Sequence, residues 1–231
     1  MQNWIFDIRS IKFFVLLIIF IIITILVYEK ITKPMDDAII NYAQSIGGKL
    51  PLDLTMMLFT EVGDLRYMII FSSVLFIKKG TRRLGLILIL SVLAGTIASA
   101  YIKESVGQER PNLDFGRDPF IIHIGKDTFP IHIGKDTFLL VGDETNSFPS
   151  GHATRTAAFA LVIGIALSRR FTKGCYLLWL YPLLVSISRV YVLQHYPTDV
   201  IGGVILGILV AGIISKKLKL HLIFESQKPS S

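Results

Sequence analysis

The chain has 231 residues, of which 52% are hydrophobic, and its mean hydropathy is +0.59. This composition excludes an ordinary soluble domain and indicates that lipid is the surrounding solvent. The net charge of +7 is also found in nucleic-acid-binding proteins, but here the basic residues cluster at the ends of apolar runs, so we expect no nucleic-acid partner. The single cysteine, Cys175, lies in an apolar run, which leaves neither a disulfide framework nor a cysteine metal site.

Six apolar runs approach the ~20 residues that cross the hydrocarbon core of a bilayer. They cover residues 11–28, 52–77, 84–104, 151–168, 175–194 and 199–215. The second is the weakest, because a full span there takes in the charged residues Glu61, Asp64 and Arg66. Charges at that depth are expected to face the bundle interior or a water-filled cavity. The sequence therefore predicts an all-α, polytopic membrane protein with six transmembrane helices, built as a single domain over residues 1–231.

The segment after the first span, residues 31–51, mixes polar and apolar side chains and ends in a Gly-Gly pair. We expect it to form a short amphipathic helix at the outer membrane interface. With the N-terminus inside, the cytoplasmic segments hold far more basic than acidic residues. The prediction is therefore a multi-pass protein of the plasma membrane, with both termini cytoplasmic and an outer loop at 105–148.

The outer loop contains the sequence IHIGKDTF twice, at 122–129 and 131–138. Two copies are too few for a repeat architecture. A tandem duplication in a tolerant loop explains them, so we assign the segment no function and expect neither His123 nor His132 to be catalytic.

The first cluster of candidate functional residues is Lys103 and Arg110, in a Lys-x6-Arg-Pro pattern at the outer end of the third span. Seven residues at about 100° each return to within ~20° of the start, so both cations can share one helix face. Gly107 weakens a strictly helical interpretation. A lone cation at this depth would be ordinary snorkelling to the interface.

The second cluster is Ser-Phe-Pro-Ser-Gly-His at 147–152, which opens the fourth span. The free N–H groups and the dipole of a helix N-terminus attract anions. We expect Ser150 at this N-terminus, with Gly151 allowing close backbone approach. His152 then stands at the mouth of an anion site, although a lone histidine before a helix is more often structural.

The third cluster is Arg189, His195 and Asp199, crossing from the fifth span to the sixth. The four-residue spacing brings His195 and Asp199 together, and Pro197 suits the first turn of the sixth helix. A carboxylate beside an imidazole fixes its tautomer and stabilises its charged form. An aspartate at the edge of a span is costly without such a partner.

Together the three clusters place cations, two histidines, one carboxylate and a helix N-terminus at the outer end of the bundle. This is the composition of a phosphoryl-transfer site, in which cations and N–H groups hold the equatorial oxygens. No nest of carboxylates is present to hold magnesium, so we expect no metal and no cofactor. The residues alone leave the roles of the two histidines open, although the nearby carboxylate favours His195 as nucleophile.

The pattern K-x6-RP, PSGH and SR-x5-H-x3-D resembles the three-part signature of the type-2 phosphatidic acid phosphatase superfamily, and every signature position is present. The six-span arrangement is also similar to that of its bacterial membrane members. The resemblance implies metal-free hydrolysis of lipid phosphates through a phosphohistidine on His195, supported by Asp199, with His152 as general acid. It further implies a phosphate cradle, formed by Lys103, Arg110, Ser150, Gly151 and Arg189.

Within that family the expected substrates are phosphatidylglycerol phosphate and undecaprenyl diphosphate, and the sequence does not rank them or define the oligomeric state. The sequence leaves open whether Arg155, just past His152, contacts the substrate or a lipid headgroup. Two other functions remain open: a lipid-linked phosphotransferase that uses the same site, and a lipid or anion transporter whose cations line a path. A transporter needs no positioned nucleophile, so replacement of His195 separates it from an enzyme.

Overall fold

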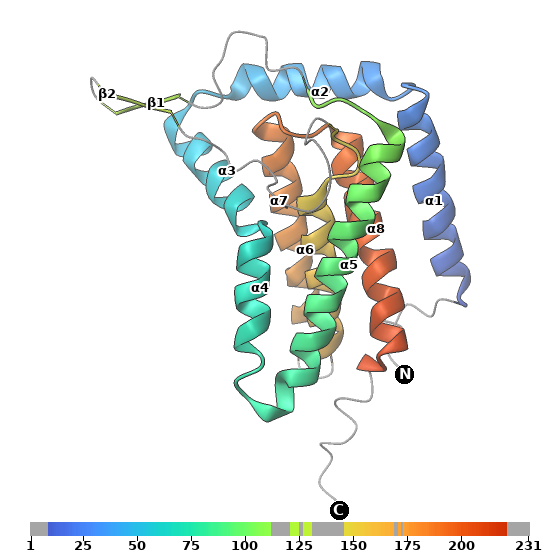
Figure 1. Ribbon diagram of the computed structural model, residues 1–231. Coiled ribbons are helices and arrows are strands. Elements are labelled where there is room, and N and C mark those ends of the chain that lie inside the picture. Colours follow the sequence, from blue (N-terminus) through green and yellow to red (C-terminus); the bar gives the residue numbers. More distant parts are fainter. Residues whose placement is uncertain are drawn as a thin grey trace, which may run out of the picture.

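The computed structural model describes residues 9–111, 121–124, 127–130, 146–168, 171 and 173–220. The described chain is mostly helical, as predicted. Its helices, in chain order, are α1 (Ile11–Tyr28), α2 (Lys33–Ile46), α3 (Leu50–Val62), α4 (Leu65–Val74), the 3₁₀ helix η1 (Lys79–Thr81), α5 (Arg82–Val106), α6 (Gly151–Leu167), the 3₁₀ helix η2 (Gly174–Trp179), α7 (Leu180–Tyr191) and α8 (Pro197–Lys217). Figure 1 shows a bundle of roughly parallel helix axes, with α2 lying across one end of it.

Helix α6 forms the centre of the bundle and packs against α5, α7 and α8. From Gly151 to Ala166 every residue of α6 is buried except Phe159. Two glycines let α8 cross it closely: a Cβ atom at Gly203 would lie 2.5 Å from the Ser150 carbonyl oxygen, and one at Gly207 would collide with the Thr154 carbonyl. Small residues permit this kind of approach between membrane helices.

Helix α1 is apolar on every face and lies at the edge of the bundle. Ser10 caps its N-terminus by accepting a hydrogen bond from the Phe13 N–H at 3.3 Å. Only Phe13, Phe20 and Val27 are buried, seven residues apart along one stripe. Leu16, Leu17 and Ile23 are partly buried beside them, and most of the other apolar side chains, such as Ile18 at 54% exposure, face outward. A helix of this composition is expected where the surroundings are lipid.

Among the described residues, three helical segments are long and apolar enough to cross a membrane: Ile11–Tyr28, Lys79–Val106 and Pro197–Lys217. The predicted second span is divided between α3 and α4 at Gly63 and Asp64, and the fifth begins as the 3₁₀ helix η2. The number of six membrane spans therefore remains a prediction, whereas the structure does show long apolar helices of the kind found in membrane proteins.

The charges in the divided span differ from one another in exposure. Asp64 caps α4 by accepting a hydrogen bond from the Arg66 N–H at 2.9 Å, and its side chain is 18% exposed. Arg66 is 71% exposed and pairs with Asp64 at 2.8 Å, so it does not point into the bundle interior, and of the two predicted environments only a water-filled one stays open for it. The Gly63–Asp64 break explains the difference, because a capping carboxylate turns toward its helix and holds Arg66 at the surface.

The described residues also include one pair of β-strands, which the prediction of an all-α fold did not contain. Strand β1 (Ile121–Ile124) pairs antiparallel with β2 (Asp127–Pro130), with Ile124 opposite Asp127. The pair falls on the first copy of the duplicated sequence, whose isoleucines and phenylalanine suit a strand. The second copy lies outside the described residues.

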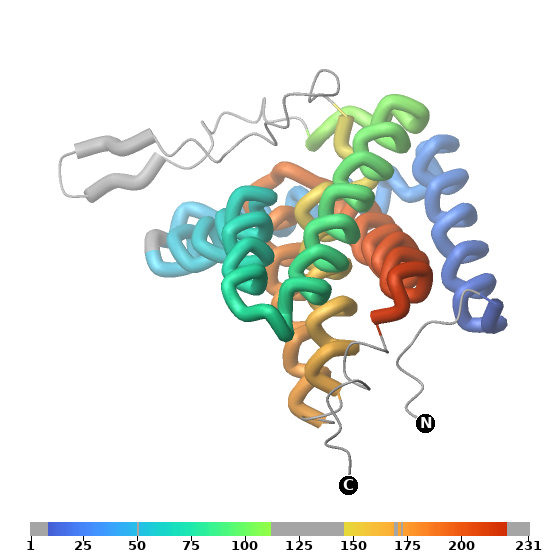
Figure 2. The backbone as a smooth tube through the Cα atoms, turned by 60° about the horizontal axis from the view of Figure 1, so that its bottom comes forward, coloured from blue at the N-terminus to red at the C-terminus, as the bar shows by residue number. Residues whose placement is uncertain are grey.

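Helix α1 begins and α8 ends at the end of the bundle opposite α2 (Figures 1 and 2). Helix α2 is fixed to the start of α8: the buried Asp36 accepts hydrogen bonds from the Thr198 hydroxyl at 2.6 Å and the Thr198 N–H at 3.2 Å. The three sequence clusters all lie at this α2 end.

Candidate active site

His195 lies in the tight connection between α7 and α8. Leu193 adopts a left-handed backbone with φ of 58°, and the N–H groups of Gln194 and His195 both donate to the Arg189 carbonyl, at 3.1 and 3.3 Å. The chain then turns into α8 at Pro197. This geometry brings His195 back over the last turn of α7, where Arg189 lies.

The Asp199 carboxylate is held between two groups. Its Oδ2 accepts a hydrogen bond from the Tyr196 N–H at 2.7 Å and lies 3.4 Å from His195 Nδ1. His195 and Asp199 are both fully buried. The carboxylate is positioned by capping α8, and the predicted pairing with His195 is present at a distance slightly beyond the usual hydrogen-bond range.

The N-terminus of α6 joins the same site. Ser150 is the N-cap residue, and its backbone N–H donates to the Asp199 carbonyl at 2.9 Å. Its Oγ is 3.5 Å from the Ala153 N–H. The segment before it packs firmly, because the Phe148 ring fills the space against Gly202, where a Cβ atom would come within 2.5 Å of the ring. The predicted Ser150 is therefore tied to Asp199 through the backbone, and Gly151 and His152 follow it in the first turn of α6.

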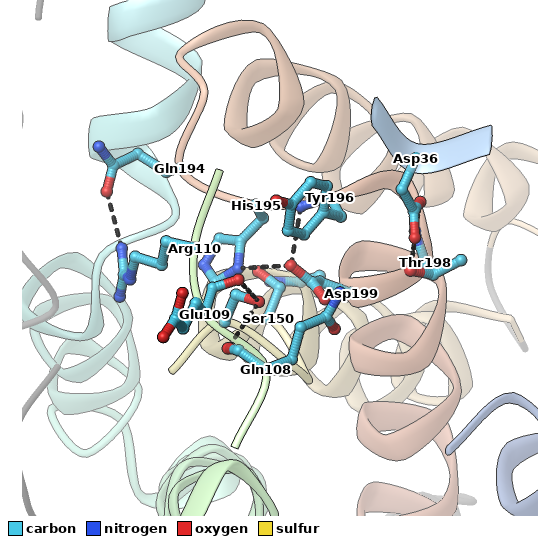
Figure 3. A network of polar contacts seen from close by, with 12 residues as sticks. Asp36, Gln108, Glu109, Arg110, Ser150, Gln194, His195, Tyr196, Thr198 and Asp199 are labelled. Atoms are coloured by element: carbon cyan, nitrogen blue, oxygen red, sulfur yellow. Dashed lines mark hydrogen bonds and ion pairs between the residues drawn. The ribbon is translucent and has the colours of Figure 1, made fainter. Parts of the chain in front are cut away.

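Lys103 and Arg110 are held by different backbone structures. Lys103 is in the last turn of α5, which ends at Gly107 with a left-handed φ of 65°. The hypothesis that both cations share one helix face is therefore wrong, because Gly107 terminates the helix before Arg110. Arg110 instead follows in an extended segment and donates from Nη1 to the Gln194 side chain at 2.7 Å, beside His195 (Figure 3).

Ser147 pins that extended segment to the start of α6. Its N–H donates to the Gln108 carbonyl at 2.6 Å, and its hydroxyl lies 3.1 and 3.2 Å from the carbonyls of Gln108 and Glu109. Glu109 and Asn146 also form an isolated antiparallel bridge. Two distant parts of the sequence are thereby held together over the site.

Arg189 is the largest fully buried side chain of the described chain. Its neighbours tie the end of α7 to α3: the Thr60 hydroxyl donates to Ser188 Oγ at 2.8 Å, and the Tyr191 hydroxyl donates to Asp53 at 2.5 Å. Removing a guanidinium from water is costly unless negative charge is at hand.

His152 has a close partner that sequence reasoning did not assign. Arg155 Nη2 lies 3.1 Å from His152 Nδ1, and both side chains are almost fully buried, at 4% and 2% exposure. The three-residue spacing on one helix was visible in the sequence. The direction of the Arg155 side chain was not visible there, because it depends on how α6 packs, and in the structure the side chain points to His152. Gly63, also unassigned, comes so close that a Cβ atom there would lie 3.0 Å from His152 Cδ2.

Two hollows adjoin the site, one on each side of α2. The polar one, of about 500 Å³, lies between the α1–α2 connection and the 106–111 segment, and reaches Arg110 and Tyr196. Lys33 borders it, with Nζ 2.6 Å from the Tyr196 hydroxyl and 2.9 Å from Asp37. Burial alone lowers the pKa of Lys33, but these two hydrogen bonds outweigh it and raise that pKa, so Lys33 is charged at neutral pH.

The second hollow is a groove of about 710 Å³ between α2, α7 and α8, walled almost wholly by apolar atoms. Its lining includes Tyr191, the last residue of α7, and Pro197, the first residue of α8, and His195 lies in the connection between them. Within the described part of the chain, no three His, Cys, Asp or Glu side chains gather as a metal site would require.

The family model of the PAP2 superfamily matches residues 84–221. Among curated proteins, the undecaprenyl-diphosphatase BcrC of Bacillus subtilis is 41% identical over 64 residues, and phosphatidylglycerophosphatase B of the same species is 39% identical over 77 residues. These matches cover only 28% and 30% of this chain, and 31% and 38% of the two relatives. An undecaprenyl-diphosphatase of Sulfolobus acidocaldarius is 26% identical over 86% of this chain and 87% of its own length.

The fold itself also matches solved structures. A transmembrane PAP2-type phosphatidylglycerolphosphate phosphatase from Bacillus subtilis superposes with a TM-score of 0.69, at 24% identity, over 96% of this chain and 100% of that one. LpxE from Aquifex aeolicus gives a TM-score of 0.54 at 24% identity, over 80% and 93% of the two chains.

Proposed function

The chain belongs to the PAP2 superfamily, and from this membership we propose that it is a membrane hydrolase that removes a phosphoryl group from a lipid phosphate. The observation that carries the proposal is the convergence of the buried His195–Asp199 pair, the α6 N-terminus and Arg110 at one end of an apolar helical bundle. This arrangement provides a nucleophile together with fixed donors for phosphoryl oxygens.

The proposed reaction has two steps. Because His195 Nδ1 faces Asp199, the lone pair of Nε2 attacks phosphorus. The N–P bond forms as the P–O bond to the lipid breaks, and the electron pair of that bond leaves with the lipid oxygen. In the second step water attacks phosphorus, the N–P bond breaks, and its electron pair returns to Nε2. Phosphate is released, with one proton of the water remaining on it and the other passing to solvent.

The charged groups and N–H groups of the site are proposed to stabilise the negative charge of the phosphoryl group. Arg110, Arg189 and Lys103, with Ser150 and the N–H of Gly151, are proposed to hold the equatorial oxygens, where transition-state charge is spread. His152 is proposed to meet the leaving oxygen through Nε2, the ring nitrogen that Arg155 does not contact. The mechanism requires no metal or other cofactor.

The lipid tail has a natural place in the apolar groove between α7 and α8. The lining runs from Trp179, at the end of η2, along α7 to Tyr191, about 18 Å at 1.5 Å per residue. This is close to the thickness of one leaflet, about half of the ~30 Å hydrocarbon core. A tail lying there would bring its polar end to His195, while the polar hollow beside Arg110 opens toward solvent. The names of the relatives make phosphatidylglycerol phosphate and undecaprenyl diphosphate the candidate substrates.

The test is phosphate release by the purified protein in lipid vesicles, in the presence of EDTA, from a panel of lipid phosphates. We expect activity in EDTA, and loss of at least about a thousandfold on His195→Ala. His123→Ala, a histidine outside the site, is the matched control and should retain activity. Loss of activity in EDTA would contradict the metal-free mechanism. Full activity of His195→Ala would contradict the nucleophile, and transfer to an added alcohol in place of release would indicate a phosphotransferase.

A further inference from the structure

The polar hollow beside the site has two buried hydrogen-bonding atoms that the fold itself does not use. The Thr32 hydroxyl and the side-chain oxygen of Gln108 belong to residues that line it, and within the described part of the chain neither atom has a hydrogen-bond partner. Thr32 is the N-cap residue of α2, yet its hydroxyl makes no capping bond to that helix. Buried polar atoms are costly when they are left unbonded. A ligand that both accepts and donates hydrogen bonds would satisfy them.

The charges around the hollow favour an anion. Three cations and two carboxylates border it: Lys30, Lys33, Arg110, Asp37 and Glu109. Asp37 is already paired with the Lys33 ammonium at 2.9 Å. An ammonium carries three donors, and the contacts of Lys33 with Asp37 and with the Tyr196 hydroxyl take two of them. The third donor can therefore serve an anion bound in the hollow.

The hollow lies beside the position at which His195 is proposed to react with phosphorus, and is distinct from it. Of the residues proposed for the active site, all of which the structure describes, only Arg110 lines the hollow. Two of its cations hold the residues next to His195 in the chain. Arg110 donates to the Gln194 side chain at 2.7 Å (Figure 3), and Lys33 donates to the Tyr196 hydroxyl at 2.6 Å. The apolar groove proposed for the lipid tail is lined by other residues of α2.

We propose that this polar hollow is a second phosphate-binding site, an inference that rests on the proposed phosphatase function. Hydrogen phosphate has the chemistry that the lining requires. Its oxygens accept from the Lys33 ammonium and the Thr32 hydroxyl, and its P–OH group donates to the Gln108 side-chain oxygen. The phosphate group comes from one of two sources: inorganic phosphate on its way from His195 to solvent, or the second phosphate of a lipid diphosphate. No covalent bond is made or broken in the hollow.

The first measurement is the dephosphorylation of a C15 prenyl monophosphate in lipid vesicles, at saturating substrate and increasing inorganic phosphate, with the prenol as the product followed. We expect added phosphate to lower the wild-type kcat, because the hollow can be filled while the lipid occupies the active site. Lys33→Met should raise the half-inhibiting phosphate concentration roughly tenfold, since hydrogen bonds between charged groups are among the strongest. Thr32→Val leaves the contact of Lys33 with Tyr196 in place and should raise that concentration several-fold.

The second measurement identifies the source of the phosphate. If inorganic phosphate is the ligand, both variants weaken its inhibition and leave KM for the C15 prenyl diphosphate unchanged. If the ligand is the second phosphate of the lipid, both variants raise KM for the diphosphate and leave KM for the monophosphate unchanged. Lys49→Met is the matched control, because it removes an exposed cation just before α3 that lines neither hollow. It should change none of these values.

The third measurement does not depend on catalysis. Inorganic phosphate should raise the thermal unfolding midpoint of the wild-type protein, relative to chloride at equal ionic strength, and should raise it less in Lys33→Met and Thr32→Val. Wild-type behaviour of both variants in all three measurements would overturn the inference, and so would equal changes in Lys49→Met. Failure of the phosphatase function looks different: no substrate would be dephosphorylated, or His195→Ala would act like the wild type. The unfolding midpoint would still report whether phosphate binds in the hollow.

Discussion

Two buried carboxylates serve the first turn of α8 in different ways. Asp199 belongs to the helix and accepts from the Tyr196 N–H at 2.7 Å, while Asp36 reaches across from α2 to the Thr198 N–H and hydroxyl. Both lie at the N-terminus of the helix, where a carboxylate interacts favourably with the helix dipole. Only Asp199 also faces His195, so stabilising the helix and orienting the nucleophile can be separated by experiment.

Replacing Asp199 by Asn is expected to lower kcat by at least about a hundredfold, because an amide no longer selects the Nδ1–H tautomer of His195. The measurement is phosphate release at saturating lipid, with the thermal unfolding midpoint recorded on the same samples. Asp36→Asn is the matched control: it weakens a cap on the same helix, and should lower the unfolding midpoint while leaving kcat of the folded protein near the wild-type value. Equal losses of kcat in both variants would show that Asp199 acts only through helix stability.

At the scale of the elements, the sequence predicted what depends on local patterns. Long apolar runs identified α1, α5 and α8, and the Ser-Gly-His sequence identified the start of α6. The spacing of His195 and Asp199 correctly paired them, although the carboxylate is oriented by capping and not by two side chains on one helix face.

What the sequence did not predict depends on contacts between distant segments. Arg110 leaves the line of α5 because Gly107 adopts a left-handed conformation, and it is then placed by the bonds of Ser147. Arg155 is turned toward His152 by the packing of the largely buried helix α6, and Gly63 touches His152 only because α3 and α4 break beside it. No periodicity carries this information.

The groove between α7 and α8 gives a prediction at the same scale. Ile201→Trp fills part of the groove and should raise KM for a long-chain lipid phosphate by roughly tenfold, the cost of displacing about two methylene groups at ~0.8 kcal/mol each. The rate with a small soluble aryl phosphate should stay unchanged, because the site itself is untouched. Ile22→Trp, on the exposed face of α1, is the control. If both tryptophan variants behave alike toward the long-chain lipid, the tail does not lie in this groove.

At the scale of the whole molecule, the basic residues and the chain-terminal ends of the first and last helices indicate the same orientation in the membrane. Helix α1 begins and α8 ends at one end of the bundle, where the basic residues Lys78, Lys79, Arg82, Lys216 and Lys217 also lie (Figure 1). The site and α2 are at the opposite end. Since basic residues are retained on the cytoplasmic side, the two termini are expected inside and the site outside. A lipid phosphatase oriented in this way acts on headgroups of the outer leaflet.

This orientation can be tested with single cysteines, because the chain contains only Cys175, which is buried and is first replaced by alanine. Ser45→Cys introduces an exposed thiol at the end of α2, and Lys79→Cys introduces one at the opposite end of the bundle, in η1. A membrane-impermeant maleimide applied to intact cells is expected to label Ser45→Cys and to leave Lys79→Cys unlabelled until the cells are permeabilised. The reverse pattern would place the site in the cytoplasm, and labelling of both in intact cells would mean that the two ends do not lie on opposite sides of a sealed membrane. Because neither residue belongs to the proposed site or lines either hollow, each variant should retain phosphatase activity, which confirms that the labelled protein is folded.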